Sequence, residues 1–329
     1  MQKSIKSLLL FLIVFGFLSC SSSGNDSDTS VNNIPAKEII KEINSGKDIY
    51  VENAVIEGDI DFRTLENPSK ENMNIKCCYL EQSLCFINCT FTGKIIMSGA
   101  GNEQDFIKTC FVRGLSLKNC IFKSEIIASN CEFRGVTDFS NSIFESKVDF
   151  VGAYFANKEV FFTDASFNGE THFSNSKFNG NVNFYKASFS SNSYFQNLIV
   201  DGNVLFANCI FASYTDFSSA SFRGITNFNY ANFRETVIMN YVSFFSRVDF
   251  IQTVFAKKNE IKNCEFHSVC RFSETEFSGQ TCFENNIFVI SSPEIKNLKQ
   301  AEGSEFNFNN NKLSTTTEMS IFEFNKIDK

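Results

Sequence analysis

Phenylalanine recurs through the middle of the chain at steps that alternate between five and six residues. The series runs from Phe133 to Phe288 and shifts once, where Phe155 is followed by Phe162. Where phenylalanine is missing, another apolar residue holds the position: Val200, Met239 and Ile261. A fixed period of this kind constrains the architecture before the local propensity of any single segment does.

The spacing excludes two simple arrangements. An 11-residue repeat can form a helical coiled coil, but that needs an apolar residue about every three or four positions. The intervening residues here are mostly Ser, Asn, Thr, Gly and Asp, which are poor helix formers. In a straight strand the side chains alternate, so a step of five would place successive phenylalanines on opposite faces. All of them can point inward only if the chain turns between them.

Small residues and glycines recur at fixed places around each phenylalanine. Compact residues such as Ala153, Ala165 and Ser176 stand two positions before it. Glycine opens several of the six-residue steps, two positions after a phenylalanine. These glycines are Gly93, Gly135, Gly169, Gly180, Gly224 and Gly279. Because glycine accepts a positive φ without steric cost, we expect them at the corners of a coil.

Units such as 165–169 (ASFNG) and 220–224 (ASFRG) resemble pentapeptide repeats, and the resemblance covers roughly residues 54–290. It implies an all-β fold, a right-handed four-sided β-helix with one unit on each side. Two five-residue steps and two six-residue steps, in alternation, then complete one coil. Phe139, Phe162 and Phe184 should stack on one side, and Phe150 and Phe173 on the opposite side. The core should therefore be filled by phenylalanine and leave no binding cavity inside.

Residues 1–19 are predicted to be a lipoprotein signal peptide. Lys3 and Lys6 precede an apolar run at 8–18, which is too short to span a bilayer. The run ends at FLSC, which resembles a bacterial lipobox with Cys20 as the lipidated residue. The alternative is ordinary signal cleavage near residues 19–23. Residues 20–33 then comprise the lipidated cysteine and a polar, flexible tether.

The segments on either side of the repeat are predicted to cover its ends. Residues 34–53 should cap the first coil with a helix at 34–46, where Asn33 suits the N-cap and Gly46 the end. Two loops are expected, at 63–72 and 98–104, and Phe106 is expected to keep the register. Residues 291–329 are predicted to be a C-terminal cap or a partly disordered tail. A short helix up to about Ala301 is expected there, followed by strand-like pairs at 306/308 and 322/324.

Nine of the twelve cysteines fall into two groups. Six of them stand two positions before a ladder residue, as small buried fillers. These are Cys89, Cys120, Cys131, Cys209, Cys264 and Cys270. Cys77, Cys78 and Cys85 break that rule and are the better candidates for disulfides in an exported protein. The spacing favours no zinc site, and we expect no metal and no cofactor.

The charge and the few ionisable clusters favour a protein without enzymatic activity. Net charge is −7, and removal of the signal peptide with its two lysines makes it −9, so binding to nucleic acid is not expected. His172 and His267 are the only histidines. His172 should point outward in a mixed column with no repeated pair of acids. The column comprises Asp149, His172, Tyr194, Asp216, Ile238 and Glu260.

Three functions stay open at this point. The leading one is a non-enzymatic, lipid-anchored scaffold of the bacterial cell envelope, attached through Cys20, in the outer membrane, and offering a protein partner its rigid sides. Resemblance to the family implies a second, a DNA-mimicking binder of DNA gyrase, and leaves a homodimer open. A third is a β-helix that binds or cleaves carbohydrate, favoured by outer aromatic residues such as Tyr194 and Tyr230.

Overall fold

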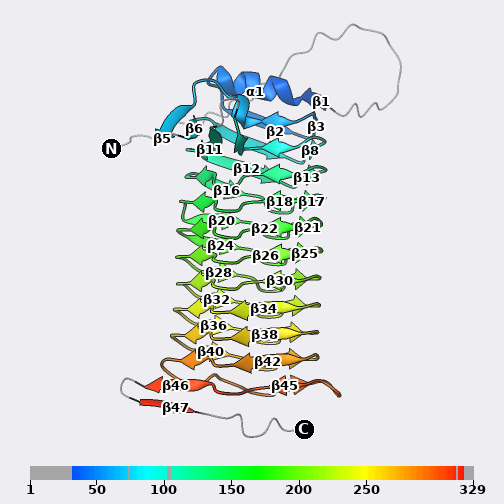
Figure 1. The fold of residues 1–329 in the computed structure, drawn as a ribbon. Coiled ribbons are helices and arrows are strands. Elements are labelled where there is room, and N and C mark those ends of the chain that lie inside the picture. Colours follow the sequence, from blue (N-terminus) through cyan, green and yellow to red (C-terminus); the bar gives the residue numbers. More distant parts are fainter. Residues whose placement is uncertain (1–31, 73, 102–104, 316–317, 322–329) are drawn as a thin grey trace, which may run out of the picture. The chain divides into compact units, whose positions relative to one another are not determined.

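Short parallel strands follow one another around a coil with four sides, and each side is a continuous sheet along the stack of coils (Figure 1). The computed structural model describes residues 32–72, 74–101, 105–315 and 318–321. Each coil visits the sides in the same order, which we call sheets 1, 2, 3 and 4. The four-sided β-helix predicted from the sequence is thereby confirmed.

Sheets 1 and 2 form two adjacent sides. Sheet 1 consists of β2 (Ile49–Glu52), β7 (Ser83–Ile87), β12 (Gly114–Lys118), β16 (Val136–Asp138), β20 (Glu159–Phe161), β24 (Asn181–Asn183), β28 (Val204–Leu205), β32 (Thr226–Asn227), β36 (Val248–Asp249) and β40 (Cys270–Arg271). Sheet 2 consists of β1 (Asn32–Pro35), β3 (Ala54–Glu57), β8 (Thr90–Phe91), β13 (Ile121–Phe122), β17 (Ile143–Phe144), β21 (Ser166–Phe167), β25 (Ser188–Phe189), β29 (Ile210–Phe211), β33 (Asn232–Phe233), β37 (Val254–Phe255), β41 (Glu276–Phe277) and β44 (Lys299–Gln300).

Sheets 3 and 4 complete the coil. Sheet 3 consists of β4 (Ile60–Asp61), β9 (Ile95–Ile96), β14 (Ile126–Ile127), β18 (Val148–Asp149), β22 (Thr171–His172), β26 (Ser193–Tyr194), β30 (Thr215–Asp216), β34 (Val237–Asn240), β38 (Asn259–Lys262), β42 (Thr281–Glu284) and β45 (Phe306–Asn307). The parallel strands of sheet 4 are β6 (Ile75–Leu80), β11 (Phe106–Phe111), β15 (Glu132–Phe133), β19 (Tyr154–Phe155), β23 (Lys177–Phe178), β27 (Ile199–Val200), β31 (Ser221–Phe222), β35 (Ser243–Phe244), β39 (Glu265–Phe266), β43 (Ile287–Phe288) and β46 (Lys312–Thr315).

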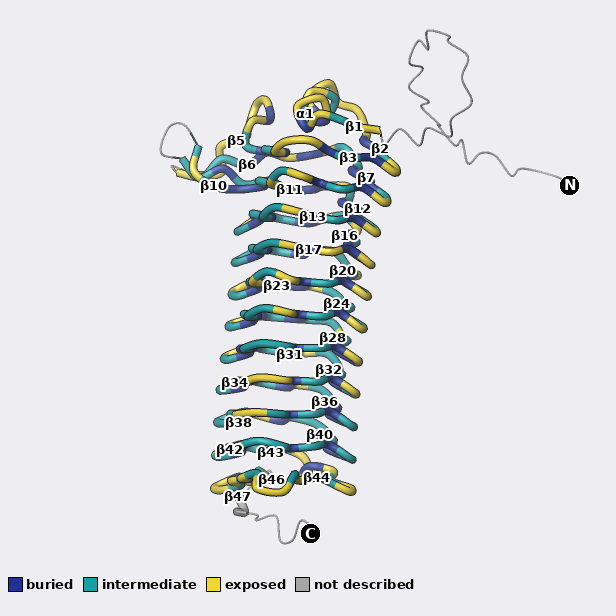
Figure 2. The backbone as a smooth tube through the Cα atoms, turned by 90° about the vertical axis from the view of Figure 1, so that its right-hand side faces the viewer, coloured by how far each residue is buried: buried dark blue, intermediate teal, exposed yellow. Residues whose placement is uncertain are grey.

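Phenylalanine rings fill the coil and stack from one coil to the next. Phe184 is 1% exposed, and its ring centroid lies 4.9 Å from that of Phe162 and 5.0 Å from that of Phe206. Across the coil, the ring of Phe184 meets that of Phe173 edge to face at 5.6 Å. Figure 2 shows buried segments at the same place in successive coils. The predicted ladders of sheets 1 and 3 are therefore confirmed, and each buried ring contributes about 1.5–3 kcal/mol to the stability of the core.

The five-residue steps turn through a residue with positive φ, and asparagine usually occupies that position. Asn175 has φ 59°, and Ser176 N donates to Phe173 O at 3.1 Å. This is the pattern of a type II turn, whose third residue must accept a left-handed backbone. Asparagine tolerates that backbone better than most residues, so it recurs at these corners along the stack.

Glycine is required at the six-residue steps for a different reason from the one expected. None of the six has a positive φ. Instead, a Cβ at Gly169 would lie 2.3 Å from the backbone carbonyl carbon of Ser146, and one at Gly135 would lie 1.5 Å from Arg113 O. Glycine is needed because neighbouring coils approach too closely at this corner for any side chain. The predicted role in a left-handed turn was wrong.

The helix at the N-terminal end covers the first coil. It forms as predicted, as α1 (Ala36–Asn44), buries Ile39 and Ile43, and is followed by Gly46 at φ 83°. The proposed cap was wrong, because Pro35 occupies the N-cap position. Residues 32–35 instead form β1, which pairs with β3, and the Asn33 amide donates to Glu57 Oε1 at 2.8 Å. Pairing to the edge of sheet 2 satisfies more backbone groups than a longer helix would.

The two predicted loops are partly strands that return along sheet 4. A short 3₁₀ helix, η1 (Phe62–Thr64), precedes β5 (Ser69–Asn72), which pairs antiparallel with β6, and β10 (Ser98–Ala100) pairs antiparallel with β11. Because of these excursions β6 and β11 are six residues long and project beyond the column of later coils (Figure 2). Phe106 lies on this projection and is half-buried. The prediction that it keeps the register of the core ladder was therefore wrong.

At the C-terminal end the chain makes a further coil instead of the predicted helix. Glu294 bridges to Arg271, β44 pairs with β41, and Ile295 packs against the core. Pairing with the preceding coil overrides the local helix signal. Phe306 lies in β45, and Phe308 stacks on Phe283 at 4.8 Å, as alternating strand residues would. Residues 322 and 324 lie outside the described residues.

The last coil ends in a hairpin. β46 pairs in parallel with β43 and antiparallel with β47 (Glu318–Ile321). In the part of the chain that the structure describes, no helix has the length and apolar content needed to cross a membrane.

Candidate functional site

The mixed column predicted on the outer face of sheet 3 is present. The register pairs each of its residues with the next one along the stack, from Asp149 to Glu260, and His172 is half-buried on the outer face as expected. The His172 ring stacks on that of Tyr194 with centroids 4.6 Å apart, and Glu170 Oε2 lies 3.4 Å from His172 Nε2. Stacking covers one face of each ring, and the Tyr214 ring lies beside that of Tyr194 with centroids 6.1 Å apart, which limits the aromatic face open to a sugar.

Asp216 is the centre of a hydrogen-bond network within this column. It is 9% exposed and accepts hydrogen bonds from Tyr214 Oη at 3.0 Å, Gln196 Nε2 at 2.9 Å and Ser218 N at 2.8 Å. Burial, followed by the charge of Asp216, raises the pKa of Tyr214 to about 12, so the phenol stays protonated as a donor. A carboxylate with three internal donors serves to fix the surface, and is a poor candidate for a general base.

His267 lies at the edge of sheet 4, away from His172. Its ring stacks on the exposed ring of Phe245 at 4.7 Å, and its Nε2 lies 3.0 Å from Glu265 Oε2. The two histidines are thus on different sides of the solenoid, each with a glutamate two residues before it in the chain. The structure does not bring them together into a site.

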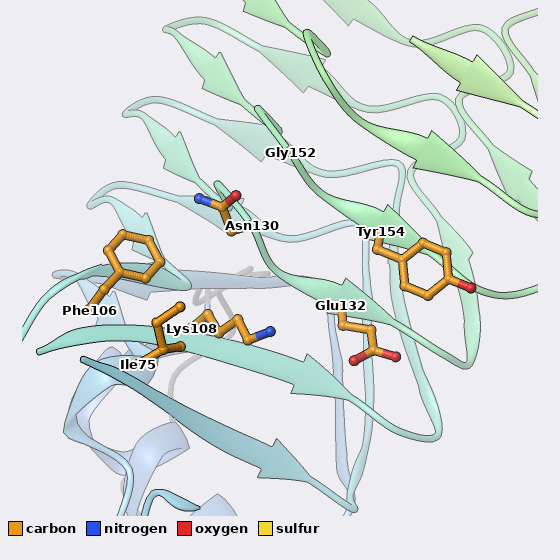
Figure 3. Close-up of a pocket in the computed structure, with 7 residues that line it drawn as sticks. All are labelled: Ile75, Phe106, Lys108, Asn130, Glu132, Gly152 and Tyr154. Carbon is orange, nitrogen blue, oxygen red and sulfur yellow. The ribbon is translucent and has the colours of Figure 1, made fainter. Parts of the chain in front are cut away.

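A groove of about 440 Å³ opens on the outer side of sheet 4, near the N-terminal end (Figure 3). It lies between the projecting end of β11 and the corners that lead into β15 and β19. In Figure 3, Ile75 and Phe106 lie at one end, and Glu132 and Tyr154 at the other. The lining comprises Ile75, Phe106, Lys108, Asn130, Glu132, Gly152 and Tyr154.

The charged groups of the groove are already paired. Lys108 Nζ lies 2.9 Å from Glu71 Oε2, and the hydrogen bond from Lys108 lowers the pKa of Glu71. Glu132 accepts two hydrogen bonds from the Arg134 guanidinium, at 2.7 and 3.1 Å. The groove therefore presents hydrogen-bonding groups without an uncompensated charge.

A protein-family model, pentapeptide repeats in nine copies, matches residues 162–210. Together with the solenoid, the match shows that the chain contains pentapeptide repeats. A search of curated proteins and a search of solved structures each found no match.

The cysteines of this pentapeptide-repeat protein are free thiols throughout the described residues. The predicted fillers are all buried in the solenoid, and burial raises the pKa of Cys131 and of Cys264 to about 12. These two thiols stay protonated and unreactive.

The three disulfide candidates are not paired with one another. Cys77 shares a hydrogen bond with Cys110 on the outer side of sheet 4. Cys78 is the next residue of the strand and points into the core, where burial raises its pKa to about 11. Cys85 lies on sheet 1. Cys20, the lipidation candidate, is outside the described residues.

Ligands for a metal do not gather in this pentapeptide-repeat protein: the residues that the structure describes contain no group of three or more His, Cys, Asp or Glu suited to hold an ion. The groove was missed by the sequence analysis. The signal that could have found it is Gly152, which interrupts the asparagines of the five-residue corners.

Proposed function

We propose that this protein is a lipid-anchored scaffold of the bacterial cell envelope, whose solenoid presents rigid faces to a protein partner. The observation that carries the proposal is the order of its parts: an apolar run at 8–18, Cys20, a polar segment to residue 33, and then the solenoid. A cysteine directly after such a run is where a lipoprotein receives its anchor. The polar segment gives the solenoid distance from the membrane surface.

The solenoid supports the scaffold part of the proposal. Its interior is occupied by side chains, so binding must use the faces, corners and ends. Outward side chains are held by bonds between coils, such as that of Ser174 Oγ to Gln196 Oε1 at 2.6 Å. Pentapeptide-repeat solenoids are typically structural folds without enzymatic activity. A rigid face costs less entropy to bind than a flexible one.

The distribution of charge speaks against the DNA-mimic alternative. A protein that imitates DNA needs rows of carboxylates without counter-charges. Here many outward acids lie next to a cation. Asp149 is 3.8 Å from Lys147, Asp201 is 2.7 Å from Arg223, and Glu260 is 2.6 Å from Lys258, each measured between carboxylate O and side-chain N. Such pairs weaken the negative field of the faces.

Metabolic labelling with a clickable fatty acid, followed by fractionation, tests the anchor. Wild-type chain should carry the label and enter the membrane fraction, and Cys20→Ala should lose both. Cys282→Ala is the matched control, because Cys282 is a half-buried thiol within the solenoid and should leave the label unchanged. An unlabelled wild type in the cytosol would overturn the proposal and make inhibition of gyrase supercoiling the next assay.

A further inference from the structure

The groove on sheet 4 exists because the regular stack is interrupted at one corner. At two neighbouring corners between sheets 3 and 4, asparagines bond to each other along the stack: Asn197 Nδ2 donates to Asn175 Oδ1 at 3.0 Å. Gly152 takes the corresponding position one coil earlier, with φ 67°, and has no side chain to continue the row. A Cβ there would lie 2.4 Å from Asn130 Oδ1, so the Asn130 side chain extends over Gly152 into the space that a side chain at 152 would occupy.

Asn130 consequently offers its amide to the groove. Within the described residues its side chain makes no hydrogen bond, and it is exposed at the rim. An amide supplies both a donor and an acceptor. The Tyr154 ring borders the groove, and its Oη, which accepts from Asn179 Nδ2, points away from Asn130 (Figure 3). Asn130 is thus the polar group that the groove presents at this corner.

The apolar part of the groove lies at its other end. Ile75 and Phe106 stand there on the projecting strands, where Phe106 pairs with Ile75 in the register of β6 and β11. Lys177 Nζ lies 5.9 Å from the centre of the Tyr154 ring. The lining is thus amphipathic, with an apolar floor at one end and hydrogen-bonding groups around it.

We propose that this groove binds one or two rings of a neutral sugar. Sugar rings combine an apolar face of C–H groups with a rim of hydroxyls, which matches the apolar Phe106 and Ile75 at one end and the polar Asn130 and Glu132 beside them. A volume of about 440 Å³ falls within the usual range of small-ligand sites. Anionic ligands are disfavoured, since the ammonium of Lys108 is already bonded to Glu71.

The groove lies on sheet 4 of the solenoid, so binding there depends on neither lipidation nor location. The proposal goes beyond a scaffold that recognises protein alone. Cys20→Ala should bind sugar as the wild type does, so the failure of one proposal would leave the other standing.

Saturation-transfer NMR on the full-length chain in detergent tests the proposal, with maltose, cellobiose and N,N′-diacetylchitobiose as probes. At least one of them should bind saturably, with a Kd of about 1 mM, as expected for a small open site. Gly152→Asn should weaken that binding at least about tenfold, because its side chain fills the groove and bonds to Asn130. Its fold should survive, since asparagine is the usual residue of this corner.

Asn197→Gly is the matched control. It removes the side chain from the corresponding corner at another coil, where β27 carries Ile199 in place of Tyr154, and should bind as the wild type does. Three results would each overturn the proposal: no saturable binding of any probe, unchanged binding by Gly152→Asn, or tighter binding of glucuronic acid than of the neutral sugars.

Discussion

The coils of residues 133–288 and the coils that precede them use the same core but differ at the surface. In the regular region the coils follow one another without excursions, and outward side chains bond to the coil above or below, as Arg223 does to Asp201. In the earlier region two excursions leave the coil, and a groove forms where the projecting end of β11 meets the first coils of the regular region. Regular packing thus gives stiffness and few places to hold a ligand, while recognition of a small molecule requires a local departure from the period.

The largest expected effect tests the regular region through its core. Phe184→Ala removes a fully buried ring that stacks on two others, and should lower the free energy of unfolding by about 3–5 kcal/mol. Phe106→Ala removes a half-buried ring outside the ladder and should cost about 1 kcal/mol or less. Urea unfolding followed by circular dichroism measures both. Equal losses would mean that the projecting strands are as much part of the core as the ladders.

A second pair of variants compares the two kinds of corner. Gly169→Asn places a Cβ 2.3 Å from backbone of the neighbouring coil, which has no room to move, and should cost more than about 2 kcal/mol. Gly152→Asn meets only the end of the Asn130 side chain and should change stability by about 0.5 kcal/mol or less. Thermal midpoints distinguish the two. A strongly destabilised Gly152→Asn would contradict the role that we give to asparagine at these corners.

The smallest expected effect is a dependence on pH. Hydrogen bonds from Lys258 and from Lys108 lower the pKa of Glu260 and of Glu71, respectively, below the ordinary value of 4.5. A carboxylate whose pKa is lower in the folded than in the unfolded state stabilises the fold at any pH above the ordinary value of 4.5. This contribution is lost as the pH falls through the folded-state pKa. For side chains near the surface, each should amount to about 1 kcal/mol or less.

The two acids should differ in where that loss is seen. Glu260→Gln should flatten the fall in global stability between about pH 5 and pH 3, because Glu260 lies within the regular stack. Glu71→Gln should leave global unfolding unchanged and instead speed hydrogen exchange of β5, whose residues are all exposed. If Glu71→Gln flattens the global curve as well, the excursions unfold together with the solenoid.

The sequence predicted the coil because its period repeats many times. Each ladder position, such as Phe162 or Phe228, supports the same conclusion, so single exceptions such as Met239 did not change the predicted fold. Features that depend on the distance between two coils could not be predicted from the period of the sequence. The role of Gly169 follows from how near Ser146 approaches it, and nothing in the chain around Gly169 reveals that distance.

Local signals were least reliable at the ends of the repeat. The residues before Ala301 suggested a helix, yet pairing of Glu294 with Arg271 continues the coil. Asn33 suggested a helix cap, yet its strand pairs with β3. In both places an unpaired edge of a sheet was available, and the free energy of completing it exceeds that of a single helical turn. The groove could be predicted only in part, since Gly152 marks the corner but the projection of β11 does not follow from the sequence.

Because every coil adds the same height, the number of coils sets the length of the solenoid. Coils are spaced about 4.8 Å apart, as neighbouring strands are, so the height of any surface feature above the first coil is set by how many coils precede it. Duplicating or deleting one whole coil within 162–288 would lengthen or shorten the protein by one such step and preserve every ladder. A change of half a coil would also keep the core, since both halves of a coil point inward alike. It would, however, move every later surface feature to the opposite side. Evolution can therefore adjust reach and orientation independently, by whole or half coils, without redesigning the interior.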